Sequence, residues 1–166
     1  NQVAMSELMR ATLQQVRFDE HDRLRELIAQ KRARAEQSVT GHGHSLAMTL
    51  ASAGMSPAAK LAHQLGGLAG IAELKYLDNT LDNKENLIAF ANGLTQIHAL
   101  MLNSPKQFLI VGEDEHLNTY RETLSNLWPT ANNTEDFAHF AIPSVSEKIK
   151  QAWLTNTQVN FCSKAY

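Results

Sequence analysis

Seven histidines offer this chain its widest choice of chemistry, because imidazole can bind a metal or transfer a proton near neutral pH. They are His21, His42, His44, His63, His98, His116 and His139. Zinc hydrolases that carry two ligands on one helix use the spacing His-Glu-x-x-His or its inversion, His-x-x-Glu-His. Neither spacing occurs in the chain. The sequence therefore predicts no zinc site carried by a single helix.

Three smaller groups remain as candidates for chemistry. His42-x-His44 could chelate a cation, but a strong site needs three or four rigidly held ligands, so we favour a turn. Glu113-Asp114-Glu115-His116 opens an expected helix, where acidic residues usually complement the helix dipole, so capping is favoured over catalysis. The only cysteine, Cys162, has no positioned histidine and is expected to pack within a strand. We therefore predict no catalytic and no metal-binding residue in this chain.

The overall composition excludes several classes of partner. The 166 residues are enough for one domain with a core, and 15 basic against 17 acidic residues give a net charge of −2. Nucleic-acid binding needs a basic surplus, so we expect no nucleic-acid partner. No apolar run approaches the roughly 20 residues that span a bilayer, so we expect no membrane partner either. A single cysteine favours a bacterial cytoplasm or an organelle matrix and leaves a periplasm open.

Apolar residues recur every three to four positions through most of the chain, which predicts helices. The expected helices cover about 4–17, 19–38, 45–53, 57–78, 83–103, 113–127 and 146–154. The charges of 19–38 are expected to form a solvated helix face. Alternating segments at 107–111 and 158–166 are expected to be strands.

These elements predict an α+β fold, in which several antiparallel helices pack on a small, incomplete β-sheet. Residues 1–157 are expected to form a helix-rich domain, and residues 158–166 the truncated first strand of a following domain. Two strands do not make a stable sheet by themselves. We therefore expect the chain to be a piece of a longer polypeptide that supplies the missing strands.

Turn and cap residues divide the first half of the chain. The residues expected in these roles are Gly41, Gly43, His44, Ser45, Gly54, Ser56 and Pro57. Gly41 and Gly43 would give backbone freedom at a chain reversal, and Gly54 could adopt a left-handed helix end. Ser56-Pro57 has the pattern of an N-cap followed by a first-turn proline. Asp82 with Glu85 three residues later predicts a capping box.

Gly66, Gly67 and Gly70 lie inside the expected helix at 57–78. A glycine inside a helix costs about 1 kcal/mol relative to alanine, so three of them need a structural reason. A phosphate-binding loop is disfavoured, because no strand precedes these glycines and no Lys-Ser/Thr follows. We expect them to allow close helix packing.

Several longer motifs resemble a known family. Phe18-Asp-x-x-Asp-Arg-Leu-Arg-Glu-Leu-Ile, Glu36-Gln37-Ser38, Gly43-His44-Ser45-x-Ala47 and Ser52-x-x-x-Ser56-Pro57-Ala58 follow one another in order. Together they resemble the presequence-protease branch of the insulinase (pitrilysin-type) zinc metallopeptidases, in the segment associated with the carboxy-terminal half. Gln158-Val159-Asn160-Phe161-Cys162-x-Lys164-Ala165 resembles the strand that opens the last homologous domain of that family.

This resemblance implies a clamshell enzyme that cuts unfolded peptides in a closed chamber, with a zinc ion held by residues outside this segment. The chain would then be a non-catalytic structural portion, inactive alone, whose partners are the remaining domains of the same polypeptide and the peptide substrates. Two alternatives stay open. One is a stand-alone helical interaction module that docks partners on the alanine-rich stripes Ala29–Ala35 and Ala47–Ala53. The other is a degenerate subunit of a separate catalytic chain.

Overall fold

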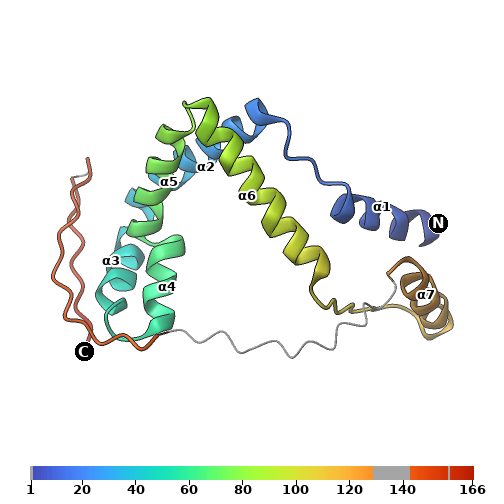
Figure 1. Cartoon of the computed structure of the whole chain (residues 1–166). Helices are drawn as coiled ribbons and strands as arrows, with labels where there is room; N and C mark the ends of the chain where they lie inside the picture. Colours follow the sequence, from blue (N-terminus) through green and yellow to red (C-terminus); the bar gives the residue numbers. More distant parts are fainter. Residues whose placement is uncertain (1, 129–142, 157) are drawn as a thin grey trace. The chain divides into compact units, whose positions relative to one another are not determined.

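The structure is a computed structural model of the chain (Figure 1), and it describes residues 2–128, 143–156 and 158–166. Its helices are α1 (Gln2–Gln14), α2 (His21–Gly41), α3 (Gly43–Ser52), α4 (Pro57–Gly66), α5 (Leu68–Thr80), α6 (Lys84–Asn103) and α7 (Asp114–Leu127). The chain forms two compact units, and the boundary between them falls near the start of α6. The described residues of unit 1 are 2–20 and 88–128, and those of unit 2 are 21–87, 143–156 and 158–166.

The expected β-sheet is wrong, because the described residues contain helices and irregular chain but no strand. The segment 107–111 is irregular and connects α6 to α7, and the described residues of 158–166 are irregular as well. Alternating side chains make a segment compatible with a strand, but a strand forms only where a second backbone pairs with it. Neither segment has such a partner. The predicted α+β class is therefore corrected to an all-helical fold.

The helix expected at 146–154 is also wrong, since these residues are irregular. The backbone N–H of Glu147 donates to the carbonyl of Gly54 at 2.9 Å, which places this segment against the chain between α3 and α4. A tertiary contact of this kind overrides a weak local helix preference. The helix periodicity of this stretch was therefore no guide to its conformation.

Unit 2 is built from helices that pack in the pairs α2·α5, α2·α3, α3·α4 and α4·α5. Its small core contains Leu46 and Leu50 of α3, Ala53 just beyond it, and Leu81 after α5. Ala53 and Leu81 are each only 2% exposed. By contrast, α2 contributes no buried residue and packs through its charged side chains. Unit 2 is therefore held by a thin apolar layer together with polar contacts.

The single helix expected at 57–78 is divided at Gly67 into α4 and α5. Gly67 has an extended backbone (φ −88°, ψ −167°), and its N–H closes the end of α4 on the carbonyls of Ala62 and His63. A Cβ on Gly67 would lie 2.7 Å from His63 Nδ1, and one on Gly70 would lie 2.7 Å from the carbonyl oxygen of Gln64. These two glycines therefore let α5 start close against the end of α4. Gly66 has no such reason, because a Cβ there would meet nothing within 4 Å.

The turn expected at Gly41–Ser45 is tighter than the sequence suggests. His42 alone separates α2 from α3, so His44 and Ser45 lie inside α3. No described glycine has a positive φ, and the left-handed helix end expected at Gly54 is therefore wrong. The glycines instead make room for neighbours: a Cβ on Gly43 would overlap the ring of Phe161, and one on Gly54 the carbonyl of Glu147.

Side-chain caps fix two of the helix starts. Ser56 Oγ accepts from the Ala59 N–H at 3.2 Å and Pro57 opens α4, so this predicted N-cap is confirmed. The cap expected at Asp82 is formed one residue later. Asn83 Oδ1 accepts from the backbone N–H of Glu85 at 2.7 Å, whereas Asp82 pairs with Arg25 of α2.

Unit 1 contains α1, which packs against α7, and most of α6. Trp128 follows α7, is 9% exposed, and its ring centroid lies 5.6 Å from that of Phe108. His98 of α6 meets the edge of Phe18 at 5.7 Å. Around these contacts the helices expose apolar residues, including Leu8, at 68%, and Leu100, at 69%. No described helix combines the length and apolar character needed to cross a membrane.

Candidate functional site

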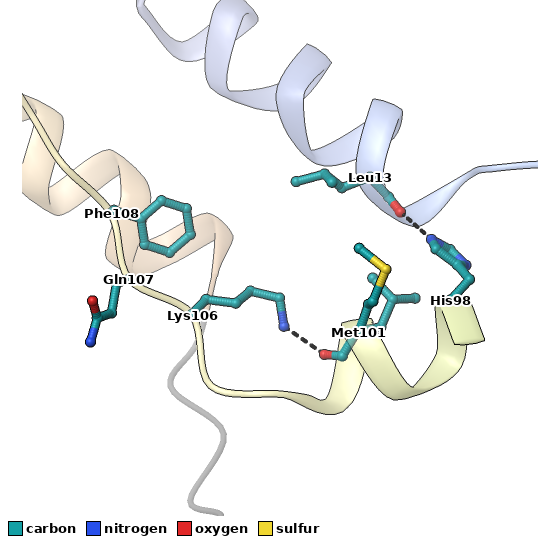
Figure 2. A pocket seen from close by; sticks show the side chains of 7 residues that line it. Leu13, His98, Met101, Lys106, Gln107 and Phe108 are labelled. Atoms are coloured by element: carbon teal, nitrogen blue, oxygen red, sulfur yellow. Dashed lines mark hydrogen bonds between the residues drawn. The ribbon is translucent and has the colours of Figure 1, made fainter. Parts of the chain in front are cut away.

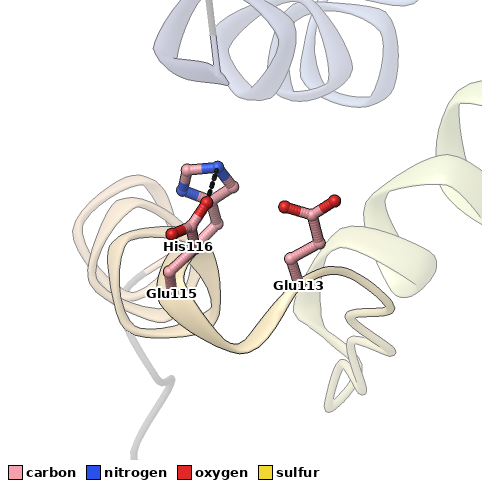
Figure 3. A group of neighbouring side chains, drawn as sticks. All are labelled: Glu113, Glu115 and His116. Carbon is pink, nitrogen blue, oxygen red and sulfur yellow. Dashed lines mark ion pairs between the residues drawn. The ribbon is translucent and has the colours of Figure 1, made fainter.

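The described residues bring together one group with the composition of a metal site, formed by Glu113, Glu115 and His116 (Figure 3). One ligand atom from each residue lies within 4.8 Å of the others, and His116 Nε2 lies 3.4 Å from Glu115 Oε1. Figure 3 shows the Glu113 carboxylate directed toward the space beside the other two side chains. Two carboxylates and an imidazole are a donor set that zinc accepts.

The position of this group opposes strong metal binding. It lies at the N-terminus of α7, where the helix dipole favours anions and disfavours cations. The side chains of Glu115 and His116 are 72% and 50% exposed, so no packing holds them in place. The expected capping role holds only in part. Asp114 and Glu115 complement the dipole in the first turn, but the Glu113 side chain makes no capping hydrogen bond.

The structure does not assemble the other candidates into a site. His42 and His44 are exposed, and within the part of the chain that the structure describes no third ligand joins them. His42 Nδ1 lies 3.3 Å from the carbonyl of Ser38, so it contacts its own helix. Cys162 is exposed, and its expected place in a packed strand is therefore wrong. His139 lies outside the described residues.

An apolar pocket of about 260 Å³ lies in unit 1 (Figure 2). It is lined by Leu13, His98, Met101, Leu102, Lys106, Gln107 and Phe108. Its polar groups are already engaged. His98 Nε2 lies 2.6 Å from the Leu13 carbonyl oxygen, and Lys106 Nζ donates to the Leu102 carbonyl at 2.5 Å. Since ligand pockets usually measure roughly 300–1,000 Å³ and present free polar groups, this one is a small apolar hollow.

The most ordered polar feature is a set of charges that joins α2 to α5, which we name the α2–α5 ladder. It consists of Arg25, Arg32, Glu36, Lys75, Asp78, Asn79 and Asp82. The Arg32 guanidinium donates to Asp78 Oδ2 at 2.8 Å and to Asn79 Oδ1 at 2.9 Å. Glu36 extends the ladder, because it accepts from Arg32 at 3.3 Å and pairs with Lys75 at 3.7 Å.

Arg32 and Asp78 are the least exposed members of the ladder, with side chains 24% and 13% exposed. The hydrogen bond to Asp78 is the main cause that raises the pKa of Arg32 above its already high ordinary value. Asp78 Oδ1 is buried without a hydrogen-bond partner, so Arg32 is its carboxylate's main compensation. The expectation of a solvated helix face therefore holds for only part of α2. Sequence periodicity could not show this, because the partners lie 46 and 47 residues apart.

The ladder also lacks the parts of a catalytic site. Its carboxylates and guanidinium groups pair with each other, and no nucleophile or positioned histidine joins them among its seven members. Its chemistry is the fixing of two helices at a set distance. Within the described residues, the candidate site with the strongest geometry is therefore structural.

Comparison with known proteins gives two matches that agree. Residues 1–77 match the family of segments associated with subfamily C of the insulinase-type peptidases. Presequence protease 1, chloroplastic/mitochondrial, of Arabidopsis thaliana is 30% identical over 95 residues, which are 57% of this chain and 9% of that protein. The chain therefore covers less than a tenth of that relative's length. No solved structure matches it. Residues 1–77 thus belong to this peptidase-associated family, as a presequence-protease-associated segment of the insulinase-type peptidases.

Proposed function

We propose that this chain is a non-catalytic structural portion of a zinc metalloendopeptidase that degrades unfolded peptides in a closed chamber. The family match over residues 1–77 carries the proposal, and the relative named as a presequence protease supports it. In this proposal the zinc ion is bound by residues outside the segment. The partners are the remaining domains of the same polypeptide and the peptide substrates. An organelle matrix or a bacterial cytoplasm is the compartment.

The α2–α5 ladder suits a structural role of this kind. Four of its members, Arg25, Arg32, Glu36 and Lys75, lie within the segment that matches the family. Salt bridges with hydrogen-bond geometry set the register of two helices more narrowly than a smooth apolar contact does. A helix pair with a fixed register can serve as a wall of a chamber whose halves must meet in one geometry.

Apolar side chains on α4 and α5 indicate surfaces that other domains would cover. Leu65 is 75% exposed, Tyr76 is 65% exposed, and Leu61 is 39% exposed. Exposed apolar residues that gather on neighbouring helices are typical of interaction surfaces. This observation also fits the stand-alone interaction module, so the deciding experiment must separate the two.

The experiment has two parts. The first reads the coding sequence around residues 1–166 for an upstream His-x-x-Glu-His helix. We expect one in the same frame. A longer frame without that motif would favour the degenerate subunit, and a frame limited to this chain would favour the module. The second part assays the purified chain with zinc on an unfolded fluorogenic peptide, with the full polypeptide as the positive control. We expect no cleavage by the chain alone. Chelator-sensitive cleavage by pure chain would overturn the non-catalytic assignment.

A further inference from the structure

The segment 143–156, which we name the strap, crosses unit 2 beside α3 and α4 as an irregular chain (Figure 1). Three contacts attach it. The Glu147 N–H donates to the Gly54 carbonyl at 2.9 Å, and Glu147 Oε1 lies 3.6 Å from Lys60 Nζ. The Trp153 ring meets the His63 ring edge-on, with centroids 6.3 Å apart and an angle of 85°.

The first two contacts hold the strap weakly. Lys60 and Glu147 have side chains that are 41% and 61% exposed, and exposed ion pairs contribute about 0–1 kcal/mol. The Glu147–Gly54 bond is the only backbone hydrogen bond that joins the described strap to the helices. Most strap residues are exposed, and Leu154 is fully so. The aromatic contact at His63 is therefore the attachment with the greatest apolar burial.

His63 is an unusual residue for this position, because it is only 8% exposed and its Nδ1 has no hydrogen-bond partner. The end of α4 closes over it at Gly67, where even a Cβ would lie 2.7 Å from Nδ1. An imidazolium ring needs partners for both N–H groups, and this site supplies none to Nδ1. Burial accordingly lowers the pKa of His63 below its ordinary value. The docked strap therefore requires the uncharged ring.

The charged and titratable groups on the surrounding elements do not replace that missing partner. They are Lys60 on α4, His44 on α3, Glu73 on α5 and, on the strap, Glu147, Lys148 and Lys150. Glu147 is paired with Lys60, and both His44 and Glu73 are exposed. Carboxylates and ammonium groups generally keep their charge between about pH 5 and pH 8, so histidine is the side chain that changes there.

We propose that the strap is a reversible element, latched on α3 and α4 by the contact between Trp153 and the uncharged His63 ring, and released when His63 is protonated. In the released state the ring is solvated and has an ordinary pKa of about 6.5. The docked state binds this proton less tightly, so docking is strongest above about pH 6.5. Below that value the docking constant falls about tenfold per pH unit until the lower pKa of the docked ring is reached.

The test follows Trp153 directly. The chain is labelled with fluorotryptophan, and fluorine NMR is recorded from about pH 8 to about pH 5. We expect the Trp153 resonance to move to the position of a solvent-exposed indole, while the Trp128 resonance of unit 1 stays unchanged. His63→Phe keeps an aromatic edge but cannot be protonated, so its Trp153 resonance should not move. His44→Gln removes an exposed histidine and should behave like the unmodified chain.

A second pair of variants tests the strap without any titration. Gly54→Ala places a methyl group on the Glu147 carbonyl and should give the released Trp153 resonance at every pH. Gly66→Ala adds the same methyl group to open space and should leave the strap docked at about pH 8. A Trp153 resonance independent of pH in the unmodified chain would overturn the proposal. The same pH transition in His63→Phe, or docking retained in Gly54→Ala, would do so too.

Discussion

Gly41 and Gly43 differ by two positions in sequence but have opposite surroundings. A Cβ at Gly43 would overlap the ring of Phe161, whereas at Gly41 it would meet nothing within 4 Å. We expect Gly43→Ala to lower the free energy of unfolding by about 1–3 kcal/mol through overpacking. Gly41→Ala should be neutral or slightly stabilising, since alanine is the better helix former. Urea denaturation of the two variants measures the difference. Equal midpoints would show that Phe161 does not pack on α3.

The Glu113, Glu115 and His116 group allows a prediction about metal binding at the residue scale. Its exposed ligands and its place at a helix N-terminus predict zinc binding weaker than micromolar. Calorimetric titration of zinc into the chain measures this, with His116→Ala as the test variant and His44→Ala as the control for the other histidine pair. Micromolar or tighter binding that disappears in His116→Ala would contradict the prediction and identify a metal site.

At the scale of elements, the helices were largely readable from the sequence and the strands were not. The helix at 83–103 is observed as α6 (Lys84–Asn103), and the one at 113–127 as α7 (Asp114–Leu127). Helices depend on hydrogen bonds between residues four apart, so local periodicity and caps such as Ser56 reveal them. The segment 107–111 has a strand-like pattern but no pairing partner, and a local pattern cannot show whether such a partner exists.

The candidate site was less predictable than the helices for the same reason. The pairing of Arg32 with Asp78 joins residues 46 apart, and the packing of Trp153 on His63 joins residues 90 positions apart (153 minus 63). Only the i,i+4 pair of Arg32 with Glu36 was visible in the spacing. Gly54 gave a local signal, but its reason is the approach of Glu147 and not a left-handed turn.

The α2–α5 ladder gives the prediction at this scale. Arg32→Gln removes the main partner of the partly buried Asp78 carboxylate, and it should lower the denaturation midpoint of unit 2 clearly. Arg23→Gln is the matched control, because Arg23 pairs with Glu26 on the same helix and both side chains are more than half exposed. Pairs of that kind contribute about 0.2–1 kcal/mol. A double-mutant cycle with Asp78→Asn measures the coupling. Equal effects of the two arginine variants would show that the ladder does not hold α2 to α5.

At the scale of the whole molecule, the question is what covers the apolar face of α1. Met5, Leu8, Met9 and Leu13 recur at helical spacing and are 51%, 68%, 44% and 44% exposed. A helix of 13 residues is marginal in water without a surface to pack on. If the chain is a structural portion of a longer peptidase, the other domains should cover this face.

Thiol labelling tests this in a Cys162→Ser background, which removes the one native cysteine. Leu8→Cys should react quickly in the isolated chain and at least about tenfold more slowly in the full polypeptide, because burial limits reagent access. Glu7→Cys lies on the opposite side of α1 by helical spacing and should react at similar rates in both. Equal rates for Leu8→Cys in the two proteins would mean that no domain covers α1. The interaction-module alternative would then gain support, since the exposed face would remain available to a separate partner.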